Sequence, residues 1–582
     1  GDVYKRQVLG VAWVGSVFMV RHSRLNGVGK TKKGGSGFSA AKPAQSQRQT
    51  ATQASEADTA KEQQAVALIN QGKLQEAEAI YRDLIAAGTR NVIVFGNLAV
   101  ICGMQGRSNE LLDLLTKALE LKPDDPDIHN NLGIALQRQG DLAAAIDSYN
   151  KALAFRPNYP EAHNNLGIAL KERGDLIAAI DSYNKALKLR PGYPEAHNNL
   201  GIALQEQGDL AAAIDSYNKA LELKPNYPDA HNNLGNALKE QGDLAAAIDS
   251  YNKALKLQPN SPDIYNNLGI ALKEQGDLAA AIDSYNKALE LKCNYPEAHY
   301  NLGNALKERG DLNAAIGSYN KALELNRNYP EAHYNLGNAF QERGDSIAAI
   351  DSYNKALKLK PGYPEAHNNL GIALKEQGDL NAAIGSYNKA LILKPNYPEA
   401  YNNLGNALKE QGDLAAAIDT YNKALELKPD YPDAYNNLGI ALKGQGDLAA
   451  AIDSYNKALE LEHSYADAHY NLGNALQEQG DLAAAIDSYN KALKLGPNHL
   501  NARKNLSMTE LLACEYKSGW ERYECRFECE DGNDILDATP CCDQWRGEKL
   551  ALGSKLLLVS EQGFGDTLQF MRYALALKKS RS

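Results

Sequence analysis

Residues Pro126–Tyr159 read PDIHNNLGIALQRQGDLAAAIDSYNKALAFRPNY, and this stretch of 34 residues decides the fold of the chain. Looser copies in the same phase begin at Asp58 and Val92, and a degenerate copy begins at Leu500. An unbroken period of this length predicts stacked repeats rather than several independent globular domains. Close copies follow without insertion from Pro160, Pro194, Pro228, Pro262, Pro296, Pro330, Pro364, Pro398, Pro432 and Ala466.

Each unit is expected to form two helices. Pro126 suits the first turn of a helix, where a missing N–H costs nothing. Gly140 is expected to end this helix, Asp141 to cap the next one, and Pro157 to stop it. The apolar residues between these signals recur at helical spacing. They are Leu132, Ala135, Leu136, Ala145, Ile146, Tyr149, Ala152 and Leu153.

The unit closely resembles the tetratricopeptide repeat (TPR) in four features of its sequence. Position eight is small, positions 20 and 27 are alanine, and position 32 is proline. The resemblance implies an all-α, right-handed superhelical solenoid whose first helices line a concave groove. One unit buries too little apolar surface to offset the entropy of ordering 34 residues, so stacking must supply the remaining burial.

We predict four segments from these boundaries. Residues 1–57 form a disordered basic leader, 58–499 form thirteen repeats, 500–533 form a degenerate capping repeat, and 534–582 begin another domain. The opening GDVYKRQ resembles translated sequencing-library sequence, so we expect Met19 to be the true start and residues 1–18 not to be native. The apolar run Val8–Val20 has 13 residues, too few to span a membrane.

The sixth position of the unit is asparagine throughout, and we interpret these side chains as candidate ligands for a peptide backbone. An amide both donates and accepts hydrogen bonds, so a row of amides could hold a main chain without reading its sequence. The repeats of protein O-GlcNAc transferases are similar and use such a ladder. The alternative is a structural role, because asparagine is common at this position in such repeats. The candidate groove residues are Asn97, Asn131, Asn165, Asn199, Asn233, Asn267, Asn301, Asn335, Asn369, Asn403, Asn437, Asn471 and Asn505, with Tyr300, Tyr334 and Tyr470 at position five.

Two further recurring patterns receive structural interpretations. Histidines at the fourth position lie 34 or more residues apart and are replaced by Tyr265, Tyr401 and Tyr435, which indicates packing rather than a metal site. Repeated Lys-Glu pairs, such as Lys239 and Glu240, are interpreted as a solvated face. No metal is predicted.

The end of the chain departs from the repeat. Tyr516–Phe527 (YKSGWERYECRF) and Lys555–Tyr573 (KLLLVSEQGFGDTLQFMRY) resemble the junction of bacterial TPR-linked glycosyltransferases of the GT-B, heptosyltransferase-like type. The resemblance implies a Rossmann-like α/β domain, a nucleotide-sugar cofactor in a full-length parent, and Asp566 as general base. The alternative is that Asp566 only caps a helix. Because the chain ends after one strand and one helix of that domain, we expect it to be inactive as it stands.

Composition narrows the function further. A net charge of −10 and a pI of about 5.7 argue against a nucleic-acid binder. The repeats hold two of the seven cysteines, which favours a reducing, cytoplasmic setting without a disulfide framework. We therefore predict a protein-binding or peptide-binding scaffold without cofactors of its own. It would be the recognition arm of a glycosyltransferase or, alternatively, a free-standing assembly scaffold.

Overall fold

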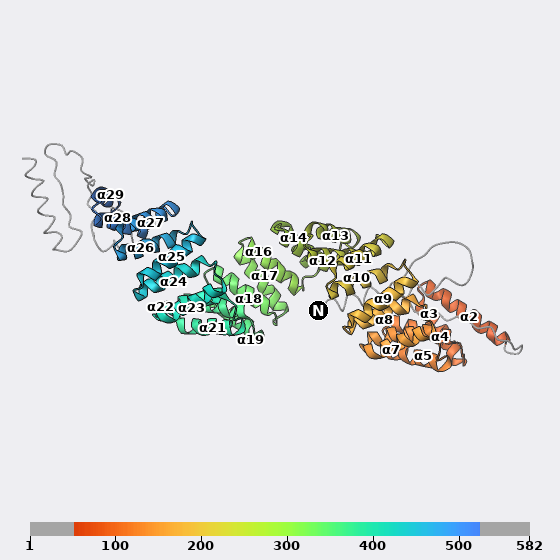
Figure 1. Cartoon of the computed structure of the whole chain (residues 1–582). Coiled ribbons are helices and arrows are strands. Elements are labelled where there is room, and N and C mark those ends of the chain that lie inside the picture. Colours follow the sequence, from red (N-terminus) through yellow and green to blue (C-terminus); the bar gives the residue numbers. More distant parts are fainter. Residues whose placement is uncertain (1–51, 524–582) are drawn as a thin grey trace, which may run out of the picture. The chain divides into compact units, whose positions relative to one another are not determined.

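The computed structural model of the chain describes residues 52–523 (Figure 1). Every regular element within that range is a helix, so the predicted all-helical repeat fold is confirmed there. The leader up to residue 51 and the predicted α/β segment 534–582 lie outside the described residues. The chain divides into two compact units, one ending at Leu325 and the other beginning at Asn326.

The helices follow the repeat closely in both units. In the first unit they are α2 Thr52–Asn70, α3 Leu74–Ala86, α4 Val92–Met104, α5 Ser108–Leu121, α6 Pro126–Arg138, α7 Leu142–Phe155, α8 Pro160–Glu172, α9 Leu176–Leu189, α10 Pro194–Gln207, α11 Leu210–Leu223, α12 Pro228–Gln241, α13 Leu244–Leu257, α14 Pro262–Gln275, α15 Leu278–Leu291, α16 Pro296–Glu308 and α17 Leu312–Leu325. In the second they are α18 Pro330–Glu342, α19 Ser346–Leu359, α20 Pro364–Glu376, α21 Leu380–Leu393, α22 Pro398–Gln411, α23 Leu414–Leu427, α24 Pro432–Gln445, α25 Leu448–Leu461, α26 Ala466–Gln479, α27 Leu482–Leu495, α28 Leu500–Leu512 and α29 Tyr516–Tyr523.

The predicted start and stop signals act as expected. Pro126 occupies the first turn of α6, and Gly140 after that helix has a φ of +86°, which a side chain would strain. Asp141 then caps α7, because its carboxylate accepts a hydrogen bond from the Ala144 N–H at 3.0 Å. The same cap recurs at Asp209 and Asp243.

Within each hairpin from α6–α7 to α26–α27, a buried tyrosine of the second helix lies against a glycine of the first. A Cβ atom added to Gly235 would stand 2.6 Å from Cε1 of Tyr251, a residue with no exposed surface. Ala247 and Ala254 of the same second helix are also fully buried. The missing side chain on the first helix therefore makes room for the largest side chain in the core.

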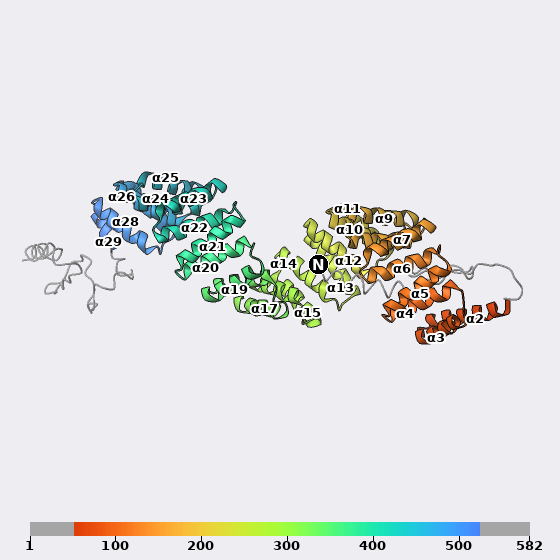
Figure 2. The same cartoon turned by 90° about the horizontal axis from the view of Figure 1, so that it is seen from below.

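Successive hairpins stack side by side in chain order within each unit (Figures 1 and 2). First helices of consecutive repeats also contact one another, as α10 does α12 and α22 does α24. No pair of second helices comes comparably close among the described residues. The first helices therefore lie on the inner side of the stack in each unit.

We predict that Gly235→Ala destabilises the array by about 1–3 kcal/mol, the usual range for overpacking a filled core. The added methyl group would collide with the ring of Tyr251, which the core holds in place. Urea unfolding followed by circular dichroism measures the loss.

Gly385→Ala is the matched control, since Gly385 lies in the second helix α21 and a Cβ there meets nothing within 4 Å. Alanine should stabilise that helix by up to about 1 kcal/mol. An equal loss of stability in both variants would contradict the packing argument.

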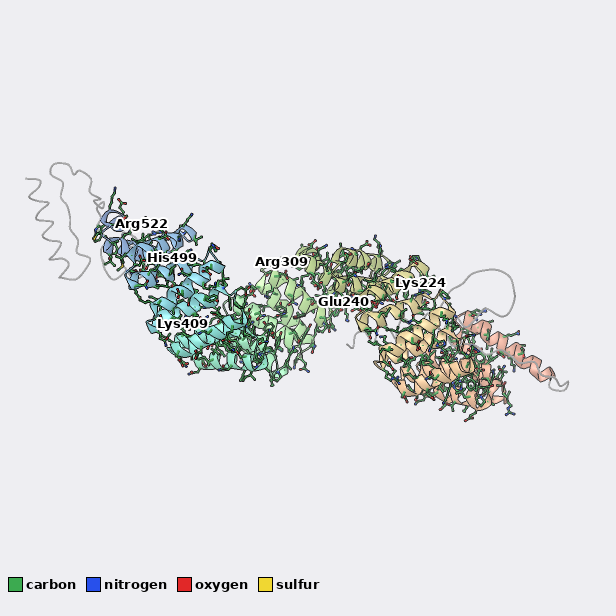
Figure 3. All side chains as sticks on the ribbon, viewed as in Figure 1. Lys224, Glu240, Arg309, Lys409, His499 and Arg522 are labelled. Atoms are coloured by element: carbon green, nitrogen blue, oxygen red, sulfur yellow. The ribbon has the colours of Figure 1, made fainter. Side chains whose placement is uncertain are left out.

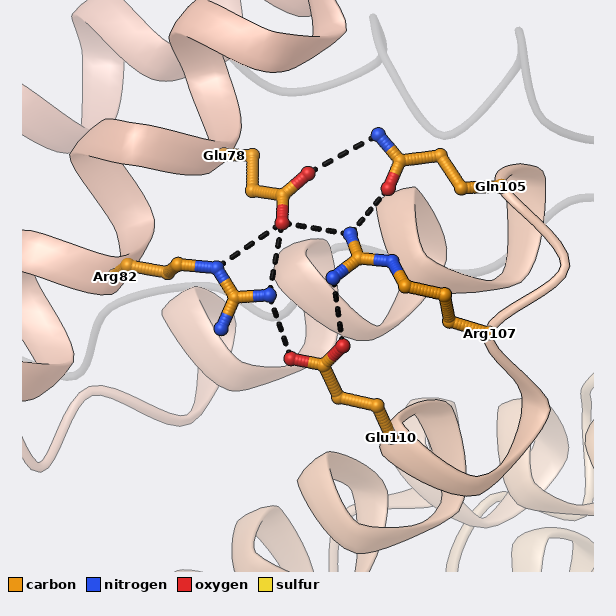
Figure 4. Close-up of polar contacts among 5 residues, drawn as sticks. All are labelled: Glu78, Arg82, Gln105, Arg107 and Glu110. Atoms are coloured by element: carbon orange, nitrogen blue, oxygen red, sulfur yellow. Dashed lines mark hydrogen bonds and ion pairs between the residues drawn. The ribbon is translucent and has the colours of Figure 1, made fainter.

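The first two hairpins are joined by a network of charges (Figure 4). Arg82 of α3 lies 2.8 Å from Glu78 and 2.6 Å from Glu110, and Arg107 lies 2.6 Å from each of the same carboxylates. Gln105 donates to Glu78 at 3.0 Å. Burial opposes ionisation of Glu78, but its hydrogen bonds from Arg82 and Arg107 outweigh burial and lower its pKa.

We expect Glu78→Gln to cost about 1–2 kcal/mol, because it leaves two guanidinium groups short of a shared carboxylate. A lowered pKa in the folded state means that the carboxylate contributes fully above its ordinary pKa of 4.5 and less as the pH falls below it. The stability gap between wild type and variant, measured in urea, should therefore shrink below about pH 4.5.

The control is Asp147→Asn, which removes an exposed pair with Lys151 at 2.7 Å. Exposed pairs of this kind contribute well under about 1 kcal/mol. If both variants lost the same free energy of unfolding, the network would contribute no more to stability than an exposed ion pair.

Candidate functional site: the amide row of the first helices

The sixth-position asparagines form what we call the amide row, and they lie on the first helices. Asn131 and Asn165 are buried, with 1% and 6% of their surface exposed. From Asn199 onward the row is half-buried and open to solvent on one side. The fifth-position asparagines beside it are mostly buried, among them Asn164, with 1% exposed.

Each regular member of the row is fixed by the repeat before it. Its Nδ2 donates to the Oδ1 of the preceding fifth-position asparagine, as from Asn199 to Asn164 at 3.0 Å. This bond joins side chains 35 residues apart. It recurs in the first unit at Asn165, Asn233, Asn267 and Asn301, and in the second at Asn403, Asn437 and Asn471.

The opposite end of these amides is free. In the part of the chain that the structure describes, the Oδ1 atoms of Asn199, Asn233, Asn267 and Asn301 accept no hydrogen bond, and none of them is buried without a partner. The oxygen of Asn131, by contrast, is buried and unpaired. The row therefore presents repeated acceptors whose orientation the inter-repeat bonds hold.

Tyrosine at position five changes this arrangement. Nδ2 of Asn369 donates to the Tyr334 hydroxyl at 3.0 Å and to Asn338 Oδ1 at 2.9 Å, while its Oδ1 accepts from Asn368. Both ends of the Asn369 amide are thus hydrogen-bonded within the protein. The sequence alone does not show that this side chain is less free to bind a peptide. Asn335 accepts from Asn338 at 3.4 Å.

The same cluster recurs in α26–α28, where Asn505 donates to Tyr470 at 3.3 Å and to Asn474 at 2.8 Å. The rings around the two tyrosines also correspond. Tyr334 packs at 4.9 Å from Tyr363, and Tyr470 packs at 4.6 Å from His499. In the first unit, Tyr300 packs 6.1 Å from Tyr319.

Charged groups near the row are mostly paired with one another. Lys171 pairs with Glu206 of the next repeat at 3.3 Å, and Gln205 donates to Glu240 at 2.8 Å. The predicted solvated face of Lys and Glu therefore includes a second repeat-to-repeat connection. At the turns, Lys224 lies 3.1 Å from Glu195 and 4.2 Å from the centre of the Tyr227 ring.

One interruption of this pairing stands at Lys409 of α22 (Figure 3). Gly444 occupies the place where the next repeat would offer a glutamate, and Lys409 has no ion-pair partner among the described residues. Burial, reinforced by the neighbouring Lys375, lowers the pKa of Lys409, although Glu410 opposes the shift. Lys409 is therefore a cation that the series of repeat-to-repeat ion pairs leaves uncompensated.

Three further predictions concern Asp566, metal binding and membrane spans. Asp566 lies outside the described residues. No group of three or more potential metal ligands comes together within residues 52–523. In the same range no helix combines the length and the apolar character that a membrane crossing needs.

Comparisons with known proteins agree with this architecture. A family model described as TPR repeat matches overlapping segments that span residues 104–480, and one described as tetratricopeptide repeat matches 466–499. None of the curated proteins compared with the chain matches it.

Several solved structures are similar over parts of the chain. A chain of the APC/C hetero-tetramer Cut9–Hcn1 is 17% identical, with a TM-score of 0.40, over 78% of this chain and 96% of that one. MamA is 32% identical, with a TM-score of 0.27, over 28% and 95%. YrrB, described as a TPR protein with an unusual peptide-binding site, is 24% identical, with a TM-score of 0.30, over 32% and 96%.

Proposed function

Because the chain belongs to the tetratricopeptide-repeat family, we propose that it is a scaffold that binds an extended segment of a partner protein along the amide row. The observation that carries this proposal is the set of solvent-facing Oδ1 atoms at Asn199, Asn233, Asn267 and Asn301. Their amides are fixed by inter-repeat bonds, so little entropy is lost when they accept a ligand.

The chemistry of the row favours a main chain over a charged ligand. An extended peptide presents backbone N–H groups, and each needs an acceptor once water is displaced. The oxygens of the row can supply such acceptors. Most nearby carboxylates and cations already neutralise one another, as Lys171 and Glu206 do, so they add little attraction for a charged partner.

We predict that changing Asn199, Asn233, Asn267 and Asn301 together to alanine weakens peptide binding by about fivefold per residue. This is the factor expected for losing roughly 1 kcal/mol of hydrogen bonding each time. Peptides selected from a random library on the intact chain are the probes, and fluorescence polarisation gives their affinities. N-methylation of the bound peptide backbone should weaken binding in the same way.

The chain offers a matched control in the fifth-position partners, Asn164, Asn198, Asn232 and Asn266. Changing these to alanine removes the same four inter-repeat bonds but keeps the exposed oxygens. Stability should fall in both sets, and affinity mainly in the first. If both sets lost affinity equally, the row would be a structural connection only.

We further propose that these repeats are the recognition arm of a glycosyltransferase, in keeping with the resemblance at the end of the chain. The described part of that resemblance, α29, packs closely on α28. A Cβ on Gly519 would stand 2.8 Å from Leu511, and Arg522 pairs with Glu510, which is only 2% exposed. These contacts support a closing element after the last repeat.

In a longer parent chain with a complete catalytic part, Asp566→Asn should lower sugar transfer from a nucleotide sugar by roughly 10²–10⁴-fold, the usual contribution of a general base. Binding of the acceptor peptide should change little. An unchanged rate would leave Asp566 as a helix cap.

The second candidate is a free-standing cytoplasmic scaffold that assembles protein complexes. It shares the amide row and needs no catalytic part. The peptide-binding test above applies to both candidates, whereas the transfer assay separates them.

A further inference from the structure

Where the fourth position is histidine, its side chain attaches the first helix to the turn before it. Nε2 of His163 lies 3.0 Å from the backbone oxygen of Pro157, and His197 and His231 repeat this contact at 3.0 Å with Pro191 and Pro225. A carbonyl oxygen can only accept, so Nε2 carries the proton and donates. In the neutral ring, Nδ1 is then a bare lone pair.

A proton on Nδ1 would have no hydrogen-bond acceptor in reach. This nitrogen is buried and has no hydrogen-bond partner in seven of the histidines that the structure describes, namely His129, His163, His197, His231, His333, His367 and His469. Protonation would create a buried, charged and unpaired N–H donor in each of them. Such a donor costs the full desolvation of its group.

The charged groups facing these rings come from the second helix of the same repeat. His163 faces Lys185 and Asp181, which form their own ion pair at 2.7 Å. His231 likewise faces Lys253 and Asp249, paired at 2.8 Å. Their opposite charges largely cancel at the ring, so burial dominates.

The other rings face similar surroundings. Glu222 adds to Lys219 and Asp215 at His197, and His463 adds to Lys491 and Asp487 at His469. His299 faces Lys321 and Glu324, His333 faces Lys355 and Asp351, and His367 faces Lys389 alone. Burial is the largest effect on all of them.

We propose that these histidines make the repeat array acid-responsive, because protonation places a charged donor without a partner at the buried Nδ1 atom, which favours release of the ring from the turn and loosens the face that carries the amide row. The proposal does not depend on what that face binds. The repeats that begin at Pro262, Pro398 and Pro432 carry tyrosine at this position and would not take part.

The expected pH range follows from the direction of the shifts. Burial lowers the pKa of His163, His197, His231, His299, His333, His367 and His469 below the ordinary 6.5, although the bond to the backbone oxygen opposes this. Unfolding then takes up protons. Stability is full above about pH 6.5 and falls as the pH drops from there towards the lowered values.

The test exchanges histidine and tyrosine, the two residues that the repeats already carry at the fourth position. His163→Tyr, His197→Tyr and His231→Tyr together should make the loss in stability between pH 7.5 and 5.5 smaller, because three histidines with a lowered pKa are removed. The reverse variant, Tyr265→His, Tyr401→His and Tyr435→His, should increase that loss. Urea unfolding of the full chain measures both. The acids whose pKa burial raises are the same in all three proteins, so their effect cancels in the comparison; they are Glu62, Asp229 and Glu510.

Nitrogen NMR of the unaltered chain provides a second readout that needs no variant. His163, His197, His231, His299, His333, His367 and His469 should show the Nε2–H form at neutral pH and titrate below 6.5. Identical pH dependence in the three proteins would overturn the proposal. So would rings that carry their proton on Nδ1 or titrate at ordinary values.

Discussion

The contact between the position-24 tyrosine and the position-eight glycine sets the distance between the two helices of every regular hairpin. Tyr251 has no exposed surface, and its ring occupies the space that a Cβ on Gly235 would need. The alanines around it, such as Ala247 and Ala254, are equally buried. Because one large side chain packs among several small ones, the two helices of a hairpin fit closely together in only one arrangement. Copies of that hairpin then stack with the same spacing.

That regular stacking is what allows side chains 35 residues apart to meet. The bonds from Asn199 to Asn164 and from Lys171 to Glu206 each join one repeat to the next, and both require the same offset between first helices. The first two hairpins lack the regular amide bond and use the network of Glu78, Arg82, Arg107 and Glu110 instead. Nearest-neighbour connections of this kind are what hold a solenoid together.

The sequence predicted the features that depend on a few adjacent residues, and it missed the contacts that form only when repeats stack on one another. The turn at Gly140 and the cap at Asp141 follow from the backbone needs of a few adjacent residues, so they could be predicted. The pairing of Lys171 with Glu206 could not, because a lysine next to a glutamate gives no sign that each bonds to another repeat. The bond from the fourth-position histidines to the preceding turn was missed for the same reason, since substitution by Tyr265 suggested packing alone. Asp566 and its neighbours lie outside the described residues, so the glycosyltransferase resemblance still rests on sequence.

The amide row shows why a structural and a binding role need not exclude each other. In Asn199 the nitrogen serves the stack and the oxygen faces solvent, so a single side chain can hold the repeat and still accept a ligand. In Asn369 the nitrogen donates to Tyr334, at position five of the preceding repeat, and to Asn338. The oxygen of Asn369 accepts from Asn368. The identity of position five therefore decides how much of the following amide remains available. Since Tyr334 and Tyr470 interrupt an otherwise regular series in the second unit, the uninterrupted run from Asn199 to Asn301 in the first unit is the stretch best suited to hold a main chain.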